Sequence, residues 1–412
     1  MNNNITPRRP NVCLLVALLL PCHASAGEGD AFSLVSSAFW QYQDNVFYLP
    51  DGSEPTQFGA GAPRGDHSRT VSVGLNLDKM VGRQHFTGNV TRNTVRYNRL
   101  GLLDYDGYSA QAGWKWRVGN DLSGDLNYTK RRYLQGFGDF RAAEVAKNLV
   151  DVESWRFAAN YKLDAYWTLF GGVNRDSLRN DLVLRQPNDY DIDRAEAGIR
   201  YTTRAGTAFE LVGRHSEGDF PNRLVGVVGA NPNATNSYSQ NDVEARVRWQ
   251  PVGHSRLSAS VGQAKRKHDD VPARDYDDVY GKFSWEWQPT GHTGVTFEAQ
   301  RQISAVDDNF SSYFQTETFS IAPVWYATGK VRVDGLLQWR TREGQGNTIF
   351  TQNGFSGLAR DEDLLTLSLG ATWAIQQNLS ANAEIRRDTR DANQQFYQYK
   401  VNSVSASVQY VF

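Results

Sequence analysis

Short segments in which apolar and polar residues alternate with a period of two recur along this chain. From Val243 to Trp249 and from Leu365 to Trp373, for example, every second residue is apolar. Successive side chains of a β-strand point to opposite faces, so each segment of about ten residues reads as a strand with one apolar and one polar face. The last segment keeps this alternation up to its final residue, Phe412.

The hydropathy of the chain excludes a helical membrane protein. Mean hydropathy is −0.56, and no apolar run after the N-terminal segment approaches the roughly 20 residues of a membrane helix. Yet the chain contains 11 Trp, 19 Tyr and 20 Phe against only 13 Pro and 2 Met. This aromatic-rich but polar composition is typical of strands that meet both lipid and water.

Residues 1–26 have the organisation of a secretory signal peptide. A basic pair, Arg8 and Arg9, precedes an apolar stretch, and Ala24-Ser25-Ala26 is a cleavage site of the A-x-A kind. We therefore expect a signal peptide over 1–26 and a single barrel domain over 27–412. Cys22 invites a lipoprotein interpretation, but Pro21 stands where a small residue is needed, which disfavours it.

Removal of this segment also removes both cysteines, Cys13 and Cys22. The mature chain then has no disulfide, no thiol nucleophile and no cysteine metal site. The 44 basic and 45 acidic residues become 42 and 45, and this slightly negative balance does not suggest a nucleic-acid partner.

The alternating segments predict an even number of strands. We count eighteen, over residues 32–47, 67–78, 83–97, 104–117, 120–133, 148–163, 165–180, 189–202, 206–217, 238–250, 255–268, 275–289, 293–305, 311–326, 330–343, 358–374, 378–390 and 395–412.

The predicted connections alternate between two kinds. Some are tight and rich in turn residues, such as Val118-Gly119-Asn120 and Pro289-Thr290-Gly291-His292. Others are long and polar, over residues 51–66, 136–147, 218–237 and 344–357. This layout predicts an all-β fold: a transmembrane antiparallel outer-membrane β-barrel of about 18 strands with short periplasmic turns and long extracellular loops.

Aromatic residues weigh against a globular β-sandwich or propeller, in which they would be scattered along the strands. Here they gather beside a tight turn or the C-terminus, as in an interfacial girdle: Trp114, Trp116, Trp249, Trp285, Trp287, Trp325, Trp373, Tyr410 and Phe412. In a closed barrel the last strand pairs with the first, and we expect Phe412 to be the signal that the barrel-assembly machinery reads.

Three Asp-Tyr-Asp pieces, at 104–106, 189–191 and 275–277, open strands that run back from long connections. Calcium binding is one interpretation. We favour the other, in which each Tyr belongs to a second girdle and is flanked by solvated acids near the outer leaflet.

A barrel of eighteen strands leaves an aqueous channel. Twelve basic and six acidic residues lie on the predicted inner faces, which makes the lumen mildly positive. These pore-lining candidates are Lys115, Arg117, Arg156, Lys162, Arg194, Glu196, Arg200, Glu244, Arg246, Arg248, Lys282, Glu286, Glu298, Arg332, Asp334, Arg340, Glu384 and Arg386. They suggest a path for a polar, anionic solute, or simple cross-strand pairing of charges in a wet interior.

Nothing in the sequence indicates catalysis. The seven His are scattered, and the chain has no GxSxG, HExxH or metal-spaced His cluster. We predict neither an enzyme nor a cofactor or metal site.

One stretch resembles a known family. Residues 39–52, which read FWQYQDNVFYLPDG, resemble the opening of the EpsL-like outer-membrane proteins of exopolysaccharide (exosortase/PEP-CTERM-associated) operons. The matching residues are Tyr42, Asp44, Asn45, Phe47, Leu49, Pro50 and Asp51, whereas Gln43 and Tyr48 depart from the family's pattern.

The resemblance implies a channel for export of an exopolysaccharide in a Wzx/Wzy-dependent pathway, with the polysaccharide in the lumen and a periplasmic polysaccharide-export protein as partner. The other expected partners are outer-membrane lipid and lipopolysaccharide. Two alternatives stay open from the barrel alone. One is a general or sugar-specific diffusion porin, usually trimeric, and the other is a structural or adhesive barrel whose long loops bind partners outside the cell. All three interpretations place the chain in the outer membrane of a Gram-negative bacterium.

Overall fold

The computed structural model describes residues 31–55, 61–138, 146–223, 235–270, 272–305, 313–345 and 360–412. The predicted signal peptide at 1–26 lies outside the described residues. So do parts of the four predicted long connections, on which the adhesive interpretation depends.

Eighteen β-strands form in the described residues. They are β1 (Phe32–Gln43), β2 (Asp66–Val81), β3 (Gln84–Tyr97), β4 (Tyr105–Val118), β5 (Leu122–Leu134), β6 (Leu149–Lys162), β7 (Trp167–Asn180), β8 (Tyr190–Thr202), β9 (Ala208–Asp219), β10 (Tyr238–Val252), β11 (Ser255–His268), β12 (Tyr276–Thr290), β13 (Thr293–Ala305), β14 (Tyr313–Tyr326), β15 (Val331–Gln345), β16 (Asp361–Gln376), β17 (Leu379–Ala392) and β18 (Tyr399–Val411).

Short 3-10 turns are the helical elements of the described connections. They are η2 (Gly101–Leu103), η3 (Val183–Asn188), η4 (Pro272–Arg274) and η6 (Gln395–Tyr397). No helix among the described residues is long and apolar enough to cross a bilayer.

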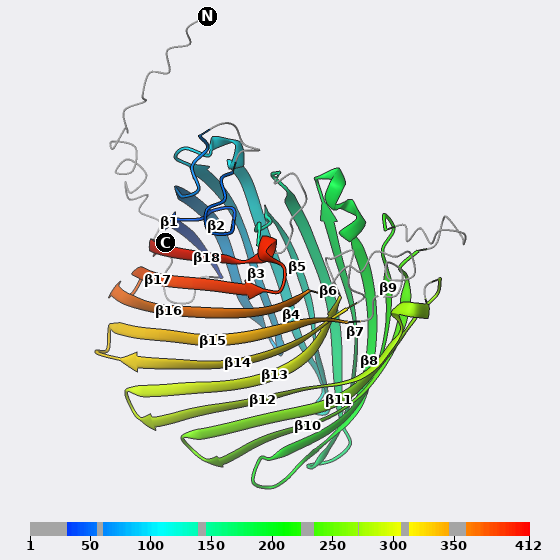
Figure 1. Ribbon diagram of the computed structural model, residues 1–412. Coiled ribbons are helices and arrows are strands. Elements are labelled where there is room, and N and C mark those ends of the chain that lie inside the picture. Colours follow the sequence, from blue (N-terminus) through cyan, green and yellow to red (C-terminus); the bar gives the residue numbers. More distant parts are fainter. Residues whose placement is uncertain are drawn as a thin grey trace, which may run out of the picture.

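The strands form one closed antiparallel sheet (Figure 1). Each strand pairs with its neighbours in sequence, and β1 pairs with β18 in a ladder that includes Val35 opposite Val411. The backbone N–H of Phe412 extends the β1–β18 ladder by donating to the carbonyl of Leu34 at 2.7 Å. A closed ladder satisfies the backbone groups of both terminal strands, as a structure that spans lipid requires.

Tight connections gather at one end of the barrel, together with Phe412, and we call this the turn end. The eight connections there are two to five residues long. In two of them Gly82 and Gly119 have φ values of 60° and 62°, a region that glycine enters without a Cβ clash. The opposite, or loop, end carries the longer connections, so the predicted alternation of connections is confirmed.

Large apolar side chains are exposed on one face of the strands. Val243 on β10 and Val261 on β11 are 61% and 58% exposed. Toward the turn end, Trp249, Trp325 and Trp373 are exposed on this face. Apolar exposure of this kind, ringed by aromatic residues, is the surface that an outer-membrane barrel presents to lipid, so the other face lines the lumen.

The second girdle predicted from the Asp-Tyr-Asp pieces is wrong. Tyr276 alternates with the lipid-facing Val279 and is 7% exposed, and Tyr105 and Tyr190 likewise lie on the lumen side of their strands. The two acids that flank each Tyr differ in their surroundings. In the piece at 104–106, Asp104 accepts from the backbone N–H of Tyr97 at 2.7 Å, and Asp106 faces outward.

Two strand boundaries differ from the prediction by four residues, and the other boundaries differ by less. β1 ends at Gln43 rather than at residue 47, because Asp44 turns away to accept the backbone N–H of Asn402 at 2.8 Å. β18 begins at Tyr399 rather than at residue 395, because residues 395–397 form the 3-10 turn η6. At Asp44 a side-chain hydrogen bond to the backbone of the neighbouring strand, and at residues 395–397 the local bonds of a 3-10 turn, replace a ladder that the alternation alone would have continued.

Candidate functional site: the charged lumen wall

The eighteen pore-lining candidates all lie on strand faces opposite the exposed apolar residues. Lys115 and Arg117 are on β4, Arg156 and Lys162 on β6, Arg194, Glu196 and Arg200 on β8, Glu244, Arg246 and Arg248 on β10, Lys282 and Glu286 on β12, Glu298 on β13, Arg332, Asp334 and Arg340 on β15, and Glu384 and Arg386 on β17. Their contact with a passing solute stays a prediction.

Several candidates form separate cross-strand or same-strand ion pairs. Lys282 lies 2.8 Å from Glu298, and Arg332 lies 3.3 Å from Asp334. Others have no carboxylate within ion-pair distance in the described part of the chain: Lys115, Arg117, Arg156, Lys162 and Arg340. The wall therefore contains both neutralised pairs and free cations.

The densest charge network joins β8, β9 and β10. Glu210, with a side chain 5% exposed, accepts from Arg200 at 2.7 Å and also contacts Arg248. Arg246 lies 3.7 Å from Glu210 and 2.8 Å from Glu244. Because each carboxylate contacts two or more guanidinium groups, these side chains hold one another in fixed positions against the wall.

Arg214 continues this network at mid-strand. It lies 3.5 Å from both Glu196 and Glu244. The hydroxyl of Tyr280 on β12 donates to Glu244 at 3.4 Å and ties the next hairpin to the same group. The carboxylate of Glu244 is thus shared among β9, β10 and β12.

Four arginines surround a hollow of about 380 Å³ beside this network. They are Arg156, Arg194, Arg214 and Arg246, and among the described residues Glu196 is the one acidic residue that lines the hollow. Each arginine comes from the middle of its strand, on β6, β8, β9 and β10. We call these four residues the arginine cluster.

Arg156 differs from the other members of the arginine cluster. Arg194 is paired with Asp176 and donates to the amide oxygen of Asn174 at 2.8 Å, whereas Arg156 is exposed and has no acidic partner in the described residues. A free guanidinium beside three that are only partly neutralised favours a negatively charged group in the hollow.

Glu210 and Arg214 were not among the predicted pore-lining residues, although they lie at the centre of the network. On β9 the exposed apolar residues are Phe209 and Leu211, and the next position on that face is Gly213, followed by His215. The apolar signal therefore ends halfway along β9. If the alternation set by Phe209 and Leu211 is continued along the whole strand, Glu210 and Arg214 both fall on the lumen face.

The residues that carried the family resemblance form a loop anchor at the loop end. The side chain of Asn45 accepts from the backbone N–H of Leu49 at 2.9 Å and donates to the carbonyl of Leu49 at 2.8 Å. This closes a tight turn that buries Phe47 completely, in an apolar cluster with Leu100 and Leu103.

The remaining residues of that stretch contact neighbouring strands. The Tyr42 ring lies 4.8 Å from that of His67, and Asp51 lies 3.1 Å from Lys400. The carbonyl of Pro50 accepts from the backbone N–H of Ser53. We therefore assign this stretch to the end of β1 and the structure of the first loop rather than to contact with a transported solute.

A family model described as "Putative beta-barrel porin 2" matches residues 256–412, which cover β11 to β18. No curated protein matches the chain in sequence. With its exposed apolar face and its closed sheet, the chain is a porin-like β-barrel of the outer membrane.

Solved porin structures are similar to the chain at low sequence identity. Pseudomonas aeruginosa OccK9 (OpdG) is 13% identical, with 93% of this chain and 98% of that chain covered and a TM-score of 0.48. P. aeruginosa OccK2 (OpdF) in complex with glucuronate is 12% identical, with 93% and 96% covered and a TM-score of 0.49. A BenF-like porin from Pseudomonas fluorescens Pf-5 is 13% identical, with 93% and 99% covered and a TM-score of 0.48.

The resemblance to EpsL-like proteins is wrong. The family model that matches the chain is a porin model, and the residues that suggested the resemblance anchor a loop. Exopolysaccharide export and its periplasmic partner were inferred from that resemblance, and no contact in the described structure supports them independently.

Proposed function

We propose that this protein is a diffusion porin that favours small, hydrated anionic solutes. The observation that carries the proposal is the arginine cluster, in which four guanidinium groups and one carboxylate line a hollow in the lumen wall. Side chains of one sign in a confined channel raise the local concentration of solutes of the opposite sign.

The arrangement supports passage rather than tight binding. The cations of the arginine cluster come from four strands, and three of the four are partly neutralised by Asp176, Glu196 or Glu244. A solute carboxylate or phosphate would meet several weak contacts instead of one deep site. Conduction requires this balance, because a solute must leave as readily as it enters.

Liposome swelling tests the proposal with two probes of similar size that differ by one charge, gluconate and glucose. We expect both solutes to enter proteoliposomes through the purified protein, and gluconate to enter faster. Equal rates of entry for gluconate and glucose would contradict the preference for anions but not the open pore. Swelling by neither solute would contradict diffusion through an open pore.

A further inference from the structure

Three connections at the loop end share a small apolar core. Its members come from the connections β1–β2, β3–β4 and β5–β6, and each is at most 8% exposed: Val46, Phe47, Leu49, Leu100, Leu103 and Phe137. The rings of Phe47 and Phe137 meet edge to face at 5.1 Å. We call these six residues the mouth core. Because the strands present their apolar residues to lipid, the mouth core is separate from the apolar surface of the barrel.

The mouth core rests on lumen-facing residues of the wall. Tyr97 packs against it and lies on the face of β3 opposite the exposed Val90. The ring of Tyr48, which also packs against the core, lies 4.9 Å from the ring of Tyr399. Tyr399 is on the face of β18 opposite the exposed Val404. The described parts of these connections therefore fold into the mouth of the barrel rather than away from it.

The mouth core also reaches a strand that is distant along the sheet. The guanidinium of Arg390, on the lumen face of β17, donates to the carbonyl of Gly138, which follows Phe137. Six steps of the closed sheet separate β17 from β5, the strand that leads to Gly138: through β18, β1, β2, β3 and β4. At about 4.8 Å a step, the contact spans roughly 29 Å of wall. The mouth core thus narrows the lumen beside six of the eighteen steps.

Hydrogen bonds fix the three connections to the wall and to one another. The carboxylate of Asp66, the first residue of β2, accepts from the backbone N–H groups of Arg99 and Leu100, both at 2.8 Å. The ammonium group of Lys147 donates to the carbonyl of Asp104, which joins the connection β5–β6 to the connection β3–β4. A network of this kind holds the mouth core in one position in the channel.

We propose that the mouth core sets the size limit for solutes, whereas the arginine cluster sets the preference for charge. Selectivity in a pore depends on its diameter and on its electrostatics, and fixed apolar side chains change the first without the second. The arginine cluster lies on β6, β8, β9 and β10, outside the stretch of wall from β17 to β5. Size and charge preference should therefore respond to substitutions independently. This size limit rests on the proposed function, since it requires a pore that is open to small solutes.

Liposome swelling with neutral sugars of increasing size measures the limit. Glucose, raffinose and stachyose are the probes, and the unsubstituted protein should admit stachyose far more slowly than glucose. Phe47→Ala removes a completely buried ring of the mouth core. We expect the ratio of stachyose to glucose swelling rates to rise several-fold and the ratio of gluconate to glucose rates to stay unchanged. An unchanged stachyose ratio, or a change in the gluconate ratio alone, would overturn the proposal.

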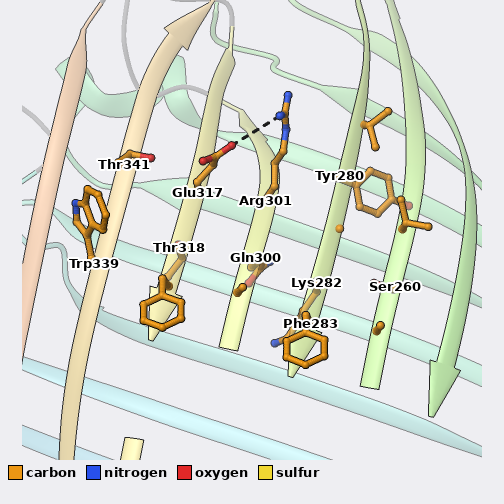
Figure 2. Close-up of a pocket in the computed structure, with 16 residues that line it drawn as sticks. Ser260, Tyr280, Lys282, Phe283, Gln300, Arg301, Glu317, Thr318, Trp339 and Thr341 are labelled. Carbon is orange, nitrogen blue, oxygen red and sulfur yellow. Dashed lines mark ion pairs between the residues drawn. The ribbon is translucent and has the colours of Figure 1, made fainter. Parts of the chain in front are cut away.

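A matched control removes the same ring from the other side of the wall. Phe283 on β12 is 41% exposed and lines a groove on the lipid-facing side of β11 to β15 (Figure 2). Phe283→Ala should leave both ratios unchanged. Phe137→Ala is a second variant of the mouth core and should act like Phe47→Ala. Heat-modifiable mobility on gels reports that each barrel has folded.

The remaining outcomes separate this proposal from the proposed function. A stachyose ratio that rises equally in Phe283→Ala would mean a general loosening of the barrel and would overturn the proposal. Equal entry of stachyose and glucose through the unsubstituted protein would also overturn it, because there would be no size limit for the mouth core to set. Entry of neither sugar would instead contradict the proposed function, and the size limit with it.

Discussion

The backbone N–H of Asn180 donates to the carboxylate of Asp189 at 2.8 Å, across the connection between β7 and β8. The same contact recurs twice. Tyr97 donates to Asp104 and His268 donates to Asp275, both at 2.7 Å. In each case the acid is the first residue of an Asp-Tyr-Asp piece, and it satisfies the N–H at the point where the preceding strand or its ladder ends. The motif thus closes three loop-end connections.

Asp189→Ala should therefore destabilise the barrel. Asp189 is 3% exposed and accepts from both the backbone and the side-chain amide of Asn180, so its loss leaves buried donors unpaired. We expect a loss of roughly 1–3 kcal/mol in the free energy of unfolding, measured by denaturant titration in micelles. Asp193→Ala, which removes an exposed partner of Arg175, is the control and should cost about 0–1 kcal/mol.

Arg156→Gln should weaken the preference for anions. The guanidinium of Arg156 is the member of the arginine cluster without an acidic partner in the described residues, and two unit charges 4 Å apart in water interact by about 1 kcal/mol. The ratio of gluconate to glucose swelling rates should fall by a few-fold. Arg175→Gln removes an arginine from the outward face of the adjacent strand β7 and should leave the ratio unchanged. Equal effects of the two substitutions would disprove a role for the cluster.

Glu210→Gln should change both stability and selectivity. Glu210 contacts Arg200, Arg246 and Arg248, so the substitution leaves three cations close together without their shared carboxylate. We expect roughly 1–3 kcal/mol less stability and a stronger preference for gluconate. Glu286→Gln, in a largely exposed pair with Arg256, should change stability little. A Glu210 variant as stable as the original would show that the network is not structural.

Phe412→Ala should reduce the amount of assembled barrel in outer membranes. The Phe412 ring lies 4.5 Å from that of Tyr410, at the end of the β1–β18 ladder that closes the barrel. The heat-modifiable band on gels reports the folded fraction. Trp373→Ala removes another exposed aromatic residue near the turn end, and it should have a smaller effect. Equal losses would show that Phe412 acts only as one girdle residue among others.

The sequence was sufficient to predict the fold, because the two-residue period of a strand can be recognised from the order of apolar and polar residues. Each of the eighteen predicted strands corresponds to one observed strand. Errors occurred where a side-chain hydrogen bond takes the place of the ladder, as between Asp44 and Asn402. The facing of Tyr276 was also misjudged, because an Asp-Tyr-Asp piece at a strand end lacks the apolar neighbours that define which face is which.

The lumen wall was only partly predictable. Alternation assigned residues such as Arg246 to the polar face, but it could not show that Arg156, Arg194 and Arg214 meet around one hollow. That meeting depends on the register of the consecutive strands from β6 to β10, and a shift of one residue would reverse every facing. The early end of the ladder between β12 and β13, beside Arg301, could not be predicted either, because both strands alternate normally past the point where their pairing stops.

The zero-current potential of the purified protein in a planar bilayer tests the central claim most directly. With a potassium chloride gradient across the membrane, the cluster around Arg156 predicts steady open-pore conductance and a potential whose sign reports preference for chloride. A potential of the opposite sign, or a membrane that stays silent, would contradict the account.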